Sequence, residues 1–215
     1  MQDSPRHNDL HSHTAIDHTN SSKTIMKRNS LIAYEDATPE VKAIYDEIME
    51  TMGEPEVFNV FKVLGANATI LRAVWSMLKG TLIEGEIPPL LKQLILFRIS
   101  VITGNKYCES LHAHAACNID PTFTYDDLIA LSEGQELEKL PSSFRVAIEI
   151  VTEAAINPKG IEDESFEFEE ELRDEGFSES EIDELMAQAY FGVMMSLITD
   201  AYEIPLESPL PVPAL

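Results

Sequence analysis

The sequence predicts an all-α fold of about eight or nine helices. Apolar residues recur at steps of three and four along most of the chain, which is the spacing of one buried helix face. Helix start signals such as Thr-Pro-Glu at residues 38–40, and stop signals such as Gly53, divide the chain into segments of helical length. No segment fits an alternating strand pattern better than a helical one, so we expect no sheet.

Composition and charge argue against several classes of protein and partner. The chain has 215 residues, of which 44% are hydrophobic, enough for one sizeable core. Its net charge of −23 argues against nucleic acid and anionic membranes as partners, because both select basic surfaces. The sequence has no apolar run of transmembrane length, no signal-peptide core and no secreted disulfide framework. We therefore expect a soluble cytoplasmic protein with no nucleic acid and no membrane as partner.

The two ends of the chain differ in composition from its middle. Residues 1–30 are polar and nearly free of apolar periodicity, which predicts a disordered N-terminal tail. The tail contains His7, His11, His13 and His18, so a weak metal-binding tail is an alternative to a plain unstructured leader. Met26 is an alternative start, since the sequence with helical pattern begins soon after it. We expect one helical domain over residues 31–205 and a Pro-rich C-terminal arm over residues 206–215.

The first three helices are delimited by clear signals. Thr38 as N-cap and Pro39 in the first turn start a helix that Gly53 ends. Residues 57–66 and 68–79 supply two further helices with large apolar side chains available for packing.

The central stretch, residues 87–117, holds two helices separated by a sharp break. Pro88 and Pro89 suit the first turn of a helix that is apolar on most sides, as in a buried helix. Gly104 ends this helix, and Asn105 is a good N-cap for the next one. Cys108 then lies in the first turn of the second helix.

Four more helical segments follow the central pair. They cover residues 124–133, 142–156, 162–175 and 178–203, the last opened by a capping box of Ser178 and Glu181. The final helix is apolar nearly all round, which indicates burial in the core or against another subunit.

Cys108 and His112 are the residues with the clearest chemical potential. A helix N-terminus lowers the pKa of a thiol and so favours the reactive thiolate. His112 is four residues further on, so its imidazole lies on the same helical face as the sulfur. Such a pair can act as nucleophile and proton shuttle. The alternative is a small buried cysteine beside a hydrogen-bonded core histidine.

The central stretch resembles the core of the carboxymuconolactone decarboxylase and AhpD-like alkylhydroperoxidase families, within their peroxidase-related branch. The resemblance rests on the segment IPPLLKQLILFRISVITGNKYCESLHAHAA and extends over about residues 30 to 205. The matching positions are Gly104, Tyr107, Cys108 and His112. Asn105 stands where the family has the first cysteine of Cys-x-x-Cys, and Gln93 stands where it usually has a glutamate.

The resemblance implies an AhpD-like helical bundle and a thiol-dependent peroxidase that reduces small hydroperoxides as an antioxidant enzyme. Cys108 would be the attacking thiolate and His112 the proton relay, with Gln93, Asn105 and Tyr107 as supporting residues. Because the resolving cysteine is missing, an external thiol reductant is expected, and no cofactor. The resemblance also implies a homo-oligomer, either a trimer or a hexamer.

Three alternatives stay open at the level of sequence. One is a non-redox lyase of the decarboxylase type, with His112 as general acid or base. Another is a helical scaffold whose catalytic site has decayed, as the departures at Asn105 and Gln93 would suggest. A metal site at Glu109 and His112 lacks the second Glu-x-x-His pair that di-iron bundles use. Cys117 lies too far along the same helix to form a disulfide with Cys108.

Overall fold

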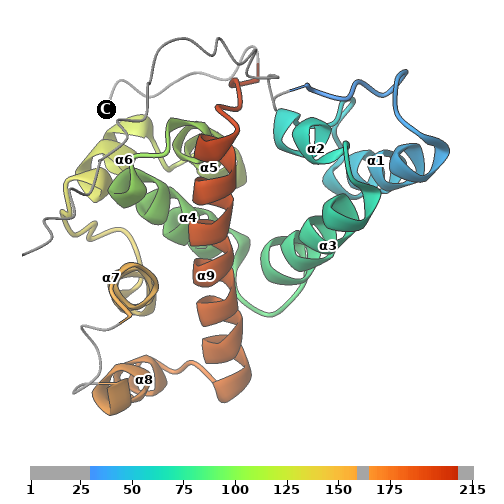
Figure 1. Cartoon of the computed structure of the whole chain (residues 1–215). Coiled ribbons are helices and arrows are strands. Elements are labelled where there is room, and N and C mark those ends of the chain that lie inside the picture. The colour runs from blue at the N-terminus through green and yellow to red at the C-terminus, as the bar shows by residue number, and fades with distance from the viewer. Residues whose placement is uncertain (1–29, 159–164, 208–215) are drawn as a thin grey trace, which may run out of the picture.

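The computed structural model describes residues 30–158 and 165–207, and the regular elements in these ranges are all helical (Figure 1). The elements are α1 (Pro39–Met52), α2 (Asn59–Leu64), α3 (Ala68–Leu78), the π-helix η1 (Lys79–Ile83), α4 (Pro89–Thr103), α5 (Lys106–Ile119), α6 (Tyr125–Ser132), α7 (Ser142–Ile156), α8 (Ser165–Asp174) and α9 (Glu179–Ala201). The predicted all-α fold is confirmed. The predicted N-terminal tail, with its histidines and Met26, and most of the C-terminal arm lie outside the described residues. No helix in the described ranges is both long and apolar enough to cross a membrane.

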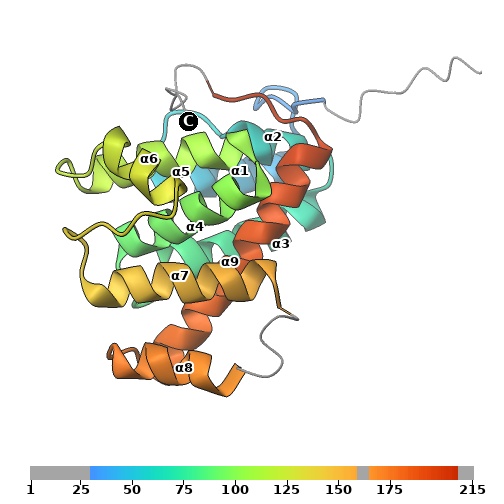
Figure 2. The same ribbon diagram turned by 90° about the vertical axis from the view of Figure 1, so that its left-hand side faces the viewer.

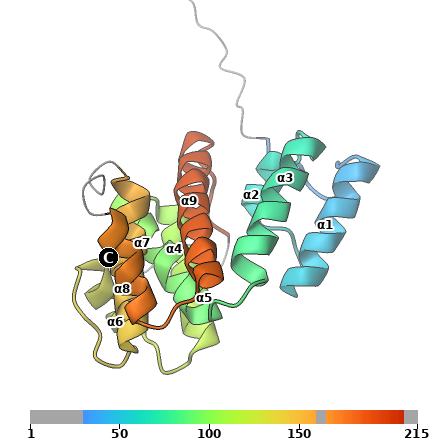
Figure 3. The same cartoon turned by 90° about the horizontal axis from the view of Figure 1, so that it is seen from below.

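Helices α1, α2 and α3 form an N-terminal unit that packs as one group beside the other helices (Figures 1 and 3). Helix α1 begins and ends as predicted, because Thr38 caps its N-terminus and Gly53 adopts a left-handed φ of 69° after its last residue. The unit has its own apolar core, in which the rings of Phe61 and Trp75 meet edge to face at 5.8 Å. This core also includes Tyr107 and Cys108 of α5, so the N-terminal unit packs directly on the predicted site.

Helices α4 to α9 form a second core with α4 at its centre (Figure 2). Helix α4 packs against α5, α7 and α9, which explains why its sequence is apolar on most sides. Gly192 lets α9 approach α4 closely, since a Cβ atom there would come within 2.6 Å of Leu96 Cδ2. The close approach brings the C-terminal half of α9 to the end of α4 and the start of α5.

The break between α4 and α5 is built as the sequence predicted. Gly104 has a φ of 72°, a conformation that glycine adopts without strain, and ends α4. Asn105 then caps α5, its Oδ1 accepting the backbone N–H of Cys108 at 2.8 Å. This turn places Cys108 in the first turn of α5.

Helix α9 differs from its prediction on one face. The capping box of Ser178 and Glu181 is present, and Phe191 is buried as expected. Tyr190 is exposed, however, and Leu197 is 67% exposed, because no element of the described chain covers that side of the helix. Within the described chain, α9 is therefore buried on the face toward α4 and exposed on the opposite face.

A buried ion pair fixes α9 to the start of α4. Lys92 is only 1% exposed, and its Nζ lies 2.6 Å from Glu184 Oε1 of α9. Glu184 Oε2 also accepts the backbone N–H of Glu86 at 2.7 Å, just before α4. Burial alone would raise the pKa of Glu184, but the hydrogen bonds from Lys92 and Glu86 lower it overall. The pair therefore sets the position of α9, and with it the position of the site.

We expect Glu184→Ala to lower the free energy of unfolding by about 3–5 kcal/mol, because it leaves the Lys92 ammonium buried without a counter-charge. Urea denaturation followed by circular dichroism measures this change. The control is Glu169→Ala, which removes an exposed partner of Arg173 and should cost less than about 1 kcal/mol. Equal losses for the two variants would contradict a special role of the buried pair.

Candidate functional site

Cys108 and His112 open onto one small cavity between the N-terminal unit and the second core. The cavity measures about 60 Å³ and receives side chains from α2, α3, η1, α4, α5 and α9. Its lining is mostly apolar and includes Val60, Leu78, Leu82, Leu96 and Leu111. One water molecule takes up about 30 Å³ in the liquid, so the cavity has room for only a very small molecule.

Cys108 is the third residue of α5 and is 5% exposed. Its Sγ lies 3.7 Å from Thr199 Oγ1 of α9. Burial raises the pKa of the Cys108 thiol to about 11, and this outweighs the hydroxyl groups of Thr199 and Ser196, which lower it. The prediction that the helix N-terminus would lower this pKa is wrong, because packing against the N-terminal unit removes the water that a thiolate needs.

His112 lies one helical turn after Cys108 and lines the same cavity, as its spacing predicted. Its Nδ1 is 2.8 Å from Gln93 Oε1 of α4. With the amide oxygen toward the ring, Nδ1 carries the proton and Nε2 keeps a free lone pair. Burial lowers the pKa of His112 to about 4, so the imidazole is neutral at neutral pH. The resting pair is therefore a neutral thiol beside a neutral imidazole.

Asn105 does more than cap α5. Its side chain is fully buried, and its Nδ2 lies within hydrogen-bond distance of three acceptors on α9. These acceptors are Ser196 O at 3.0 Å, Thr199 Oγ1 at 2.7 Å and Asp200 Oδ1 at 2.6 Å. Asn105 thus joins the start of α5 to the end of α9.

Tyr107 also lines the cavity, and its hydroxyl is hydrogen-bonded to residues outside α5. Its hydroxyl donates to Glu207 Oε1 at 2.7 Å and accepts the backbone N–H of Val60 at 3.2 Å. Glu207 Oε1 also accepts the backbone N–H of Asn59 at 2.6 Å. Burial and the Glu207 carboxylate raise the pKa of Tyr107, so its hydroxyl stays protonated. Tyr107 and Glu207 together cap the N-terminus of α2.

Sequence reasoning missed Ser196, Thr199 and Glu207. They lie some 90 residues or more beyond Asn105 and Cys108, and no spacing rule connects them to the central stretch. The one available signal was the presence of two hydroxyl residues in the otherwise apolar run of α9.

The other candidate groups do not assemble into a site. Glu109 is buried and forms an ion pair with Lys106 at 2.9 Å. His114 is hydrogen-bonded to Asn118 at the surface, and Cys108 and Cys117 are both free thiols. Within residues 30–158 and 165–207, no three His, Cys, Asp or Glu side chains are placed to hold a metal ion.

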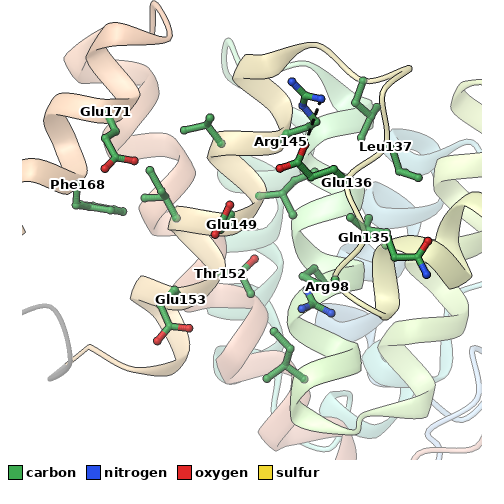
Figure 4. Close-up of a pocket in the computed structure, with 17 residues that line it drawn as sticks. Arg98, Gln135, Glu136, Leu137, Arg145, Glu149, Thr152, Glu153, Phe168 and Glu171 are labelled. Atoms are coloured by element: carbon green, nitrogen blue, oxygen red, sulfur yellow. Dashed lines mark ion pairs between the residues drawn. The ribbon is translucent and has the colours of Figure 1, made fainter.

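A larger cavity of about 800 Å³ lies on the other side of α4, between α7, α8 and the segment before α7 (Figure 4). It contains two cations, of which Arg98 donates to Ser132 O at 2.6 Å and Arg145 lies 3.6 Å from Glu136. Arg98 thereby satisfies a carbonyl at the C-terminal end of α6, which is a structural role. The carboxylates around this cavity are Glu136, Glu149, Glu153 and Glu171. Its lining has no cysteine and no histidine, so size alone does not make it the reactive site.

Residues 68–120 match the model of the Carboxymuconolactone decarboxylase family. The match runs from α3 to the end of α5 and includes Gln93, Asn105, Cys108 and His112. The family resemblance predicted from the sequence is thereby confirmed. No curated protein sequence matches the chain.

Solved structures with the same fold come from proteins of low sequence identity. A peroxidase-related protein from Silicibacter sp. TM1040 has a TM-score of 0.68 at 19% identity, covering 88% of this chain and 97% of its own. A peroxidase-related protein from Ralstonia eutropha JMP134, described as an alkylhydroperoxidase AhpD core, has a TM-score of 0.72 at 15% identity, with coverages of 85% and 93%. A cysteine-to-alanine variant of the debrominase Bmp8 in complex with 2,3,4-tribromopyrrole has a TM-score of 0.69 at 20% identity, with coverages of 88% and 95%. At these identities the likeness establishes an AhpD-like helical fold.

We expect alkylation of Cys108 by iodoacetamide, measured in a Cys117→Ser background, to be slow at pH 7 and to rise about tenfold per pH unit up to pH 10. Below a thiol's pKa the thiolate fraction grows tenfold per unit, and the pKa of Cys108 is raised to about 11. The same variant unfolded in urea is the control and should show a midpoint of about 8.5. A plateau at or below that value in the folded protein would contradict the buried, neutral thiol.

Proposed function

The chain carries a segment of the carboxymuconolactone decarboxylase family on an AhpD-like helical fold, and from this premise we propose that it is a thiol-dependent peroxidase with one reactive cysteine. The observation that supports this best is the cavity that Cys108 and His112 share, with Gln93 Oε1 2.8 Å from Nδ1 of the imidazole. A nucleophile, a base and a group that orients the base are the minimum that this chemistry requires.

The proposed reaction begins at Cys108. His112 Nε2 takes the thiol proton as Sγ attacks one oxygen of the hydroperoxide, the S–O bond forms and the O–O bond breaks. The proton returns to the leaving oxygen, so the peroxide is reduced to an alcohol or water and Cys108 is oxidised to the sulfenic acid. One external thiol then forms a mixed disulfide with Cys108 and releases water, and a second thiol restores the free cysteine.

Gln93 is a positioning residue in this scheme. Its Oε1 accepts the Nδ1 proton of His112 and so keeps the lone pair of Nε2 available toward the cavity. A neutral amide cannot stabilise the imidazolium as a carboxylate would, which makes His112 a weak base. We therefore expect slow turnover at neutral pH.

The size and charge of the site favour a small hydroperoxide over the substrate of a lyase. A cavity of about 60 Å³ lined mostly by aliphatic side chains suits a compact, uncharged molecule. The described elements around the cavity contribute no cation that would bind a carboxylate substrate. The external reductant stays part of the proposal, because Asn105 supplies no resolving thiol and Cys117 lies too far along α5 to do so.

We expect Cys108→Ser to lower hydroperoxide consumption with dithiothreitol by about a hundredfold or more, and His112→Asn to lower it by about a hundredfold, since proton transfer contributes at this level. Residual peroxide is measured over time by an iron–xylenol orange assay. Cys117→Ser is the control and should keep the wild-type rate. Equal rates for wild type and Cys108→Ser would remove the peroxidase proposal.

We expect Gln93→Glu to increase the rate at pH 7 by about tenfold. A carboxylate facing Nδ1–H would raise the pKa of His112 and make it a stronger base toward the thiol. The pH dependence of peroxide consumption tests this, with Gln135→Glu, a change at an exposed position, as the control. A rate at pH 7 that stays at the wild-type level would show that His112 does not take the thiol proton.

A non-catalytic scaffold is the second candidate function. The high pKa of Cys108 and the low pKa of His112 support it, because both groups rest in their less reactive state. We also propose a homo-oligomer, a trimer or a hexamer, which the family resemblance implies and the exposed Tyr190 and Leu197 of α9 support.

A further inference from the structure

Two buried hydroxyl groups of α9, those of Ser196 and Thr199, lie near the Cys108 sulfur. Thr199 Oγ1 is 3.7 Å from Sγ, and Ser196 is three residues earlier on the same helical face. Ser196 and Thr199 are 1% and 2% exposed. Hydroxyl groups this deeply buried normally have a structural hydrogen bond or a functional reason to be there.

Ser196 has no such structural bond. Its Oγ finds no hydrogen-bond partner among the described residues, although it is close enough to lower the pKa of Cys108 against the larger, opposing effect of burial. The hydroxyl is therefore an unused donor as long as the sulfur is protonated. It gains an acceptor when the sulfur ionises.

The hydroxyl of Thr199 is hydrogen-bonded to Asn105. Asn105 Nδ2 lies 2.7 Å from Thr199 Oγ1 and donates to it, while the threonine proton rests on Met195 O at 2.9 Å. Because a hydroxyl can rotate, this proton can turn to the sulfur without movement of any heavier atom. The bond from Asn105 polarises the hydroxyl and makes it a better donor.

The other described side chains around the sulfur bring no standing positive charge to a thiolate. The charged side chains that act on the sulfur are Asp200 of α9 and Glu207 after α9, and both raise its pKa. On α5 the neighbours are the neutral His112 and the protonated Tyr107. Helices α2, α3, η1 and α4 contribute only aliphatic side chains and Ser100 to the cavity. A buried anion without hydrogen-bond donors is strongly disfavoured, so a donor beside the sulfur increases the amount of thiolate that forms.

We propose that Ser196 and Thr199 are positioning residues that stabilise the Cys108 thiolate by donating hydrogen bonds to its sulfur, with Asn105 orienting Thr199. The pair takes the place of the cation that commonly activates a catalytic cysteine. This inference rests on the proposed function, because it concerns the same sulfur. It is nevertheless tested by measuring the reactivity of the Cys108 thiol alone.

The test is the alkylation rate of Cys108 in a Cys117→Ser background, followed from pH 7 to pH 10. Thr199→Val should lower the rate about tenfold at each pH, because a hydrogen bond to a charged group is lost and less thiolate forms. Ser196→Ala should lower it several-fold. Thr199→Ser keeps the donor and should restore the wild-type rate. Thr152→Val is the matched control. Thr152 is also buried and its hydroxyl also has no partner among the described residues, but it lies on α7 and does not line the cavity of Cys108.

Unchanged alkylation rates in both Thr199→Val and Ser196→Ala would overturn the inference. Circular dichroism establishes that each variant is folded, and Ser196→Ala decides alone if Thr199→Val does not fold. Hydroperoxide consumption is measured on the same samples. If wild type consumes no peroxide but the alkylation rates shift as expected, the inference stands and the proposed function fails. If peroxide is consumed and the alkylation rates do not shift, the proposed function stands and the inference fails.

Discussion

The buried amide of Asn105 is the contact on which the arrangement of the site depends. Its oxygen starts α5 by accepting the N–H of Cys108, and its nitrogen is bonded to the C-terminal part of α9. One side chain therefore fixes the direction of the helix that carries the sulfur and the helix that supplies the hydroxyl groups around it. A cysteine at this position could not satisfy the same four partners, because a thiol has one weak donor and is a weak acceptor. An amide at position 105 is thus specifically suited to its place between α5 and α9.

Cys108 and His112 differ in character from an activated cysteine and its base at an open helix end. Packing of the N-terminal unit over α5 removes water from both Cys108 and His112, and burial favours the neutral form of each. On the order of 10⁻⁴ of the sulfur is ionised at pH 7 for a pKa of about 11. Any chemistry at Cys108 then depends on proton transfer during attack rather than on a standing thiolate. The neutral hydroxyl groups of α9 and the amide of Gln93 are suited to that situation, because they add no charge to a mostly apolar cavity.

The local part of this structure could be predicted from the sequence, and the long-range part could not. Thr38, Gly53, Gly104 and Asn105 act within a few residues of themselves, so the ends of α1, α4 and α5 follow from rules of helix capping. The spacing of Cys108 and His112 likewise fixes their common face. The pKa of the thiol, however, is set by α2, α3 and α9, which are distant in sequence and whose packing no local pattern reveals. For the same reason Ser196 and Thr199 could not be assigned to the site. The exposure of Leu197 was missed because an apolar sequence does not say which of its faces finds a partner.

The hydrogen bonds of Glu207 connect the end of the described chain to the surroundings of Cys108. Oε1 of this residue holds both the first N–H of α2 and the hydroxyl of Tyr107, and Pro205 O accepts from the Asn59 side chain at 3.0 Å. The end of the described chain is therefore hydrogen-bonded both to the N-terminus of α2 and to Tyr107 of α5. Loss of the Glu207 carboxylate would leave the backbone N–H of Asn59 without its acceptor and the Tyr107 hydroxyl without the group it donates to, beside the cavity that Cys108 lines.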